Sequence, residues 1–153
     1  MKRTIVMGVV ALMGVAGVAG AQGQTSPGPA EIVAARQASF DMSAVTLGAI
    51  KTQLDAGAPP QGIAFAASGL NKWATALPTM FPAGTGSDSL PGATKARPEI
   101  WTNRADFEAK AAAYAAATAD LQAKVAANDT DGALAAWTIV RGTCGSCHDA
   151  YRE

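Results

Sequence analysis

The residues best suited to chemistry lie near the C-terminus, where Cys144, Cys147 and His148 follow the pattern Cys-x-x-Cys-His. This spacing is typical of covalent c-type haem attachment. On a helix, residues i, i+3 and i+4 share one face, so two thiols can reach the two vinyl groups at one porphyrin edge. The adjacent imidazole can then bind the iron. The motif therefore predicts one covalent haem c per chain, with His148 as the iron ligand.

Three other uses of these residues explain less of the pattern. A structural disulfide would use both cysteines but leaves His148 without a role. A thioredoxin-like redox pair expects a βαβ setting, which nothing in the sequence supplies. A closed zinc site needs four ligands, and the chain offers two cysteines and one histidine.

The elements that position the motif are predicted to be helices, because alanine is abundant and strand-like alternation of β-branched residues is scarce. Apolar residues recur at three-four spacing over four segments, about 29–56, 60–77, 104–128 and 131–152. Thr130 is the expected N-cap of the last segment. Four such stripes predict an all-α fold, an antiparallel up-down-up-down four-helix bundle with the haem at one end.

This topology brings the end of the fourth helix to the start of the first, beneath the long segment 78–103. That segment is rich in Gly, Pro, Ser and Thr, and we expect either a flexible lid or an ordered loop. Trp101 favours partial order. The haem should lie near Arg36, Phe40 and Leu77.

The second axial position of the iron separates two kinds of haem protein. A ligand there gives a low-spin electron carrier, whereas an empty position leaves a high-spin haem that binds small gases. Met42 lies two residues after Phe40, about 200 degrees around the helix, and should point away from the face of Phe40. Met80 lies at the haem end and stays open as an alternative ligand. An apolar wall at Phe40 would offer no hydrogen bond to oxygen, which matters less for nitric oxide and carbon monoxide.

The N-terminal segment has the features of a secretory signal. Lys2 and Arg3 precede an uncharged apolar run, and Ala19-Gly20-Ala21 is a small-x-small cleavage site. We expect a signal peptide over 1–21 and a mature periplasmic domain over 22–153, without membrane contact after cleavage; an uncleaved anchor is the alternative. Loss of the two basic residues takes the formal charge from zero to about two negative, which gives no electrostatic reason to bind nucleic acid.

Over essentially the whole mature chain, these residues resemble the cytochrome c prime family of class II c-type cytochromes. The resemblance rests on Cys-Gly-Ser-Cys-His-Asp-Ala-Tyr-Arg ending at Arg152, on Arg36-Gln37 followed by Phe40, and on Arg97-Pro-Glu-Ile-Trp101. It implies a four-helix bundle, often a homodimer through the first two helices. It also implies a five-coordinate, high-spin haem that binds nitric oxide and carbon monoxide.

The resemblance also assigns roles to single residues. It implies thioethers at both cysteines, His148 as proximal ligand, and Phe40 at the bulky distal position where low-spin relatives have Met. Arg152 matches a basic proximal position implicated in handling nitric oxide. The haem contacts that it implies elsewhere are Arg36, Gln37 and, where the loop reaches the haem, Lys95. Apart from the resemblance, a basic residue near the start of a helix opposes the helix dipole, so the position of Arg36 is better explained by binding to a haem propionate than by a solvated charge. Arg152 lies near the end of a helix, where the dipole alone explains a basic residue without any function.

Three hypotheses follow from the sequence. The first is a gas-binding haem protein that sequesters nitric oxide in the periplasm. The second is a low-spin electron carrier that uses Met80 and exchanges electrons with periplasmic redox partners. The third is a minor subunit of a dehydrogenase or reductase. The sequence shows no catalytic triad, paired carboxylates or nucleotide-binding loop, so we do not expect an enzyme.

Overall fold

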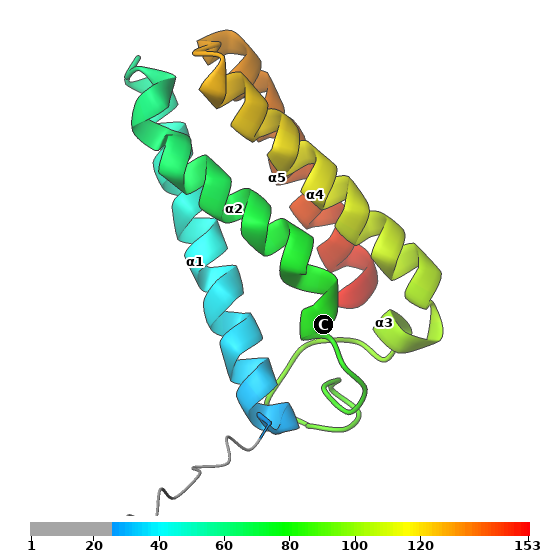
Figure 1. Ribbon diagram of the computed structural model, residues 1–153. Coiled ribbons are helices and arrows are strands. Elements are labelled where there is room, and N and C mark those ends of the chain that lie inside the picture. Colours follow the sequence, from blue (N-terminus) through cyan, green and yellow to red (C-terminus); the bar gives the residue numbers. More distant parts are fainter. Residues whose placement is uncertain (1–25) are drawn as a thin grey trace, which may run out of the picture.

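The computed structural model describes residues 26–153, so the signal peptide expected over 1–21 lies outside the described residues. The long helices are α1 (Pro29–Asp55), α2 (Ala64–Ala76), α4 (Arg104–Ala126) and α5 (Thr130–Tyr151). Short helices η1 (Pro60–Ile63), η2 (Leu77–Met80) and α3 (Glu99–Thr102) join them. Figure 1 shows α1 paired with α2, α4 paired with α5, and the long loop at one end. The prediction of an all-α four-helix bundle is confirmed.

The start of α5 differs from its predicted position by one residue. The Asp129 carboxylate, not the Thr130 hydroxyl, caps the helix by accepting a 2.9 Å hydrogen bond from the Gly132 N–H. Asp129 is extended, with φ −91° and ψ 92°, and Thr130 is already helical. Asn128 precedes it at φ 56°, a left-handed conformation that asparagine tolerates well. The Thr130 prediction was wrong because the carboxylate one residue earlier takes the capping position.

The core consists of two clusters along the bundle. The first lies between the four long helices and contains Leu47, Ile50 and Leu54 from the apolar face of α1. The second lies beneath the long loop and is rich in aromatic rings, with Phe81, Phe107 and Tyr151 buried in it. Neighbouring rings meet edge to face, Phe81 on Phe107 at 4.9 Å between centroids and Phe107 on Tyr151 at 5.5 Å. The second cluster therefore supports the end of the bundle where the motif lies.

The long loop is ordered over this end, which is one of the two alternatives that the sequence left open. Arg36 on α1 is 2% exposed, and its guanidinium holds the loop through hydrogen bonds to Thr85 and Thr94. The Trp101 indole donates to the Phe81 carbonyl at 3.2 Å and so helps to order the loop, as the sequence predicted. Ala96 pairs with Arg152 in an isolated antiparallel bridge. The loop is thus tied to the first helix and to the last.

Among the described helices, none combines the length and apolar composition that a membrane span needs.

Candidate haem site

A cavity of about 810 Å³ opens at the loop end of the bundle, between α1, α4, α5 and the loop. Its volume lies within the roughly 300–1,000 Å³ of small-molecule and cofactor sites. The structure brings every predicted site residue into its lining: Arg36, Gln37, Phe40, Lys95, Cys144, Cys147, His148 and Arg152. Residues more than a hundred positions apart in the sequence therefore meet around one hollow.

The two thiols lie one helical turn apart on α5, and both are free. Burial is the main cause that raises the pKa of Cys144 and of Cys147, so both groups are neutral thiols near pH 7. The Cys144 thiol also contacts the Val140 carbonyl at 3.5 Å. Two reduced sulfurs and one imidazole on the same wall are the donor set that covalent haem attachment needs.

The imidazole of His148 occupies the last turn of α5. Partial burial, followed by the positive charges of Arg152 and Arg141, lowers its pKa, while Asp149 opposes this change. A lowered pKa favours the neutral imidazole, which is the form that binds a metal. The local electrostatics therefore suit an iron ligand.

Arg36, which lines the cavity, also has a structural role that the sequence did not predict. Its terminal nitrogens donate four hydrogen bonds, to the Met80 carbonyl, to the Thr85 hydroxyl and carbonyl, and to the Thr94 hydroxyl, at 2.9–3.1 Å. The Arg36 guanidinium also lies 4.2 Å from the Phe81 ring centroid. A guanidinium has five N–H donors, so only the Nε–H remains for a propionate. Arg36 is chiefly the anchor of the loop.

The other polar residues of the rim are held by backbone contacts. Gln37 donates to the Ala93 carbonyl at 2.9 Å and so adds a second tie between α1 and the loop. The Glu153 N–H donates to the Lys95 carbonyl at 2.9 Å, next to the bridge between Ala96 and Arg152. Lys95 and Arg152 therefore lie at the same edge of the cavity.

Phe40 forms part of the α1 wall, and its ring is fixed by two others. Trp73 on α2 meets it edge to face, with centroids 5.2 Å apart and planes at 88°. Phe81 meets it from the loop side at 6.4 Å. Such pairs stabilise one ring orientation. The apolar wall expected at Phe40 is present and rigidly backed.

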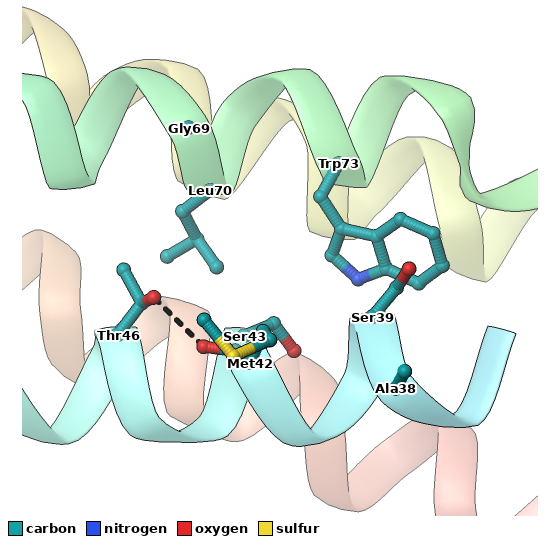
Figure 2. A pocket seen from close by; sticks show the side chains of 8 residues that line it. All are labelled: Ala38, Ser39, Met42, Ser43, Thr46, Gly69, Leu70 and Trp73. Atoms are coloured by element: carbon teal, nitrogen blue, oxygen red, sulfur yellow. Dashed lines mark hydrogen bonds between the residues drawn. The ribbon is translucent and has the colours of Figure 1, made fainter. Parts of the chain in front are cut away.

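Met42 and Met80, the two methionines within residues 26–153, lie outside the cavity lining. Met42 is 65% exposed and lines a separate groove between α1 and α2, as Figure 2 shows, so its predicted direction away from the face of Phe40 is confirmed. Met80 packs its side chain against the second core cluster, and its carbonyl accepts from Arg36. Within residues 26–153, neither sulfur belongs to the set of side chains that lines the cavity.

Arg141 and Tyr114 are two of several cavity residues that were not predicted to belong to the site. Arg141 lines the cavity two turns before His148, and that seven-residue spacing, which places both on one helix face, was the available signal. Tyr114 lies in the segment predicted as the third helix and packs against the apolar core, and it also lines the cavity. Burial and then Cys144 raise the pKa of Tyr114, so its hydroxyl stays protonated. The cavity wall is therefore less uniformly apolar than Phe40 suggested.

Comparisons with known proteins agree with this geometry. A family model described as Cytochrome C' matches residues 31–152. The chain is 33% identical over 132 residues to a cytochrome c' of Rubrivivax gelatinosus, covering 82% of this chain and 96% of that protein. Matches to a cytochrome c' of Alcaligenes xylosoxydans xylosoxydans (43% identical) and a cytochrome c-556 of Agrobacterium tumefaciens strain B2A (39%) cover 38% and 52% of this chain. These two matches span only 46% and 60% of those relatives' lengths.

Solved structures resemble the whole bundle. The Rubrivivax gelatinosus cytochrome c' has a TM-score of 0.74 at 28% identity and covers 84% of this chain and all of its own. A nitric oxide complex of a mutant cytochrome c prime from Alcaligenes xylosoxidans has a TM-score of 0.74 at 29% identity, covering 84% of this chain and 99% of its own.

Proposed function

Because the chain belongs to the cytochrome c prime family, we propose that it is a periplasmic monohaem cytochrome that binds nitric oxide and carbon monoxide. Its haem would be five-coordinate and high-spin, and its role would be to sequester gas, with slow electron transfer to redox partners as a secondary use. A signal peptide over 1–21 would direct the domain over 22–153 to the periplasm. The family implies covalently bound haem c, and the single Cys-x-x-Cys-His motif supports one haem per chain.

The observation that carries this proposal is the meeting of two free thiols, one imidazole and one phenylalanine around a single cavity. Cys144 and Cys147 would carry the thioether bonds, and His148 would hold the iron as its proximal ligand. The bound haem supplies an iron centre with one open coordination site. The thioethers would fix the porphyrin in a constant orientation against α5.

Phe40 would cover the other face of the porphyrin and leave the iron without a sixth protein ligand. The ring has no atom that binds iron, and its contacts with Trp73 and Phe81 hold it in place. Met80, the rival ligand, packs into the cluster beneath the loop. These contacts favour gas binding over low-spin electron transfer, since access and polarity on that face decide which ligand binds.

The charged rim would serve the propionates and the proximal face. Lys95, Gln37 and the Arg36 Nε–H are the donors at the loop edge. Arg152 would lie near the proximal ligand, since its charge already acts on His148, and the family resemblance implies a role for it in handling nitric oxide. The nitric oxide complex of the Alcaligenes relative supports this choice of ligand. A homodimer through α1 and α2 is part of the proposal, and both helices carry exposed apolar residues such as Met42 and Phe65.

A visible spectrum of the purified holoprotein tests the proposal. We expect high-spin bands in the oxidised and reduced forms, and a clear change when carbon monoxide is added to the reduced protein. Met80→Ala should leave both spectra unchanged. Sharp low-spin bands that resist carbon monoxide and become high-spin in Met80→Ala would favour the electron carrier. Copurification with a larger enzyme would favour a subunit role.

A further inference from the structure

The cavity proposed to hold the haem concentrates positive charge. The chain has twelve basic residues, of which Lys2 and Arg3 lie outside the described residues, and twelve acidic ones. Five of the ten other basic residues line the cavity, whereas Asp41 is the single acidic residue within residues 26–153 that does so. The five come from α1, the loop, α4 and the end of α5: Arg36, Lys95, Lys110, Arg141 and Arg152. In a chain with more acidic than basic described residues, this distribution makes the cavity locally positive.

Most of this charge has a partner once haem is bound. Arg36 is 2% exposed and bound to the loop, and the Lys110 ammonium lies 4.0 Å from the Asp106 carboxylate. Lys95 and Arg152 lie at the loop edge of the cavity, where the two propionates of the haem are proposed to lie.

Arg141 lies away from the loop edge, two turns before His148 on α5. It forms no ion pair with a carboxylate within residues 26–153. Neither a neighbouring acid nor a propionate therefore neutralises its charge.

Arg141 also lies beside the residues that would hold the haem. It precedes Cys144 by three residues and His148 by seven, so the three share one face of α5. Burial raises the pKa of the Cys144 thiol, and the positive charge of Arg141 opposes this rise. Burial, Arg152 and then Arg141 lower the pKa of His148. The charge of Arg141 thus acts on both the attachment edge and the proposed iron ligand.

We propose that Arg141 raises the reduction potential of the haem and so favours the ferrous iron that binds carbon monoxide. Reduction transfers one electron from a one-electron donor to Fe(III), gives Fe(II), and lowers the charge at the iron by one. A nearby cation repels the ferric centre more than the ferrous one, so it stabilises the reduced state. The inference rests on the proposed function, because it needs a haem held by His148 on the same helix.

A redox titration of the holoprotein with dithionite and ferricyanide, followed by its visible spectrum, measures the midpoint potential in the absence of any gas. Arg141→Gln removes the charge and should lower the ratio of ferrous to ferric haem at a fixed potential about threefold, or about 28 mV. Arg141→Glu reverses the charge and should lower the ratio about tenfold, or about 59 mV. Because Arg141 is exposed, both shifts should shrink at high ionic strength.

Two further variants are controls. Arg141→Lys keeps the positive charge and should titrate as wild type does. Lys72→Gln neutralises an exposed lysine outside the cavity lining and should not shift the midpoint potential.

The outcomes separate charge from other roles of the side chain. Midpoint potentials of Arg141→Gln and Arg141→Glu equal to that of Lys72→Gln would overturn the proposal. A shift in Arg141→Lys as large as in Arg141→Gln would assign the effect to side-chain shape and would also overturn it. If Arg141→Glu cannot be obtained with haem, the glutamine and lysine variants still decide. A wild-type holoprotein that does not bind carbon monoxide would contradict the proposed function, and the effect of Arg141 on the potential would remain measurable.

Discussion

The Tyr151 hydroxyl donates a 2.6 Å hydrogen bond to the Asp106 carboxylate and so joins the last residue of α5 to the first turn of α4. Tyr151 is buried, and its ring also packs edge to face on Phe107. Burial and the Asp106 carboxylate together raise the pKa of Tyr151 to about 12. Because Tyr151 lies one turn after His148, this contact fixes the end of the helix that carries the proposed iron ligand.

The raised pKa of Tyr151 predicts a loss of stability in alkali. In the unfolded chain this phenol ionises near its ordinary value of 10, whereas in the folded protein it stays protonated to about pH 12. Its contribution to folding is therefore complete below pH 10 and is lost as the pH rises through that interval. Urea unfolding of the holoprotein between pH 9 and 12 should show a steeper loss for wild type than for Tyr151→Phe. Parallel curves for the two proteins would contradict the assignment.

The loop anchor predicts a large cost for replacing Arg36. Arg36→Met removes four hydrogen bonds and leaves the buried hydroxyl and carbonyl oxygens of Thr85 without a donor, whereas the Thr94 hydroxyl still accepts from the Ala96 N–H. We expect the free energy of unfolding to fall by about 2–4 kcal/mol. Arg36→Lys should lose most of the same energy, because an ammonium group lacks the fork that reaches both threonines.

Gln37→Ala is the control for this loss, since it removes one exposed hydrogen bond to the loop and should cost no more than about 1 kcal/mol. Amide hydrogen exchange of the loop in the Arg36 variants separates local from global effects. Loop protection equal to that of wild type would mean that another contact holds the loop.

The helices were predictable because their signals are local. Val33 and Leu47 lie fourteen residues apart, about four helical turns, and Ile50 follows three residues later, so all three share one face, and all three are buried in α1. The bounds were predicted to within a few residues for the same reason. The cap of α5 was missed because Asp129 and Thr130 are both good capping residues, and the left-handed Asn128 selects between them.

The site residues that could be predicted are those that belong to the haem motif or to the segments that resemble the family. Cys144 and His148 follow from a five-residue pattern. The hydrogen bonds of Arg36 could not be predicted from any sequence pattern, because they join residues about fifty positions apart. Which of these residues pair depends on how the loop folds back. Spacing within the sequence carries no information on such contacts. Tyr114 was missed for a related reason, since an apolar stripe does not show which of its members borders a cavity.

The covalent attachment predicts the behaviour of a double cysteine variant. Cys144→Ala combined with Cys147→Ala removes both sulfurs, while His148 can still bind iron. Haem should then be extractable from the purified protein with acidified organic solvent, whereas wild type should retain its haem in the protein fraction. Ser146→Ala, which changes an exposed residue between the two cysteines, should behave as wild type. Haem that stays in the protein fraction of the double variant would place the attachment elsewhere.

The position of Phe40 in the cavity wall predicts that a methionine there converts the protein to a low-spin cytochrome. A methionine side chain is similar in reach, flexible, and carries a thioether that haem iron accepts as an axial ligand. Reduced Phe40→Met should show sharp low-spin bands and bind carbon monoxide much more weakly than wild type. Phe81→Met is the matched control, because Phe81 lines the same cavity but is buried against Arg36 in the loop. Phe81→Met should stay high-spin. If Phe81→Met became low-spin and Phe40→Met did not, the loop rather than α1 would face the open side of the iron.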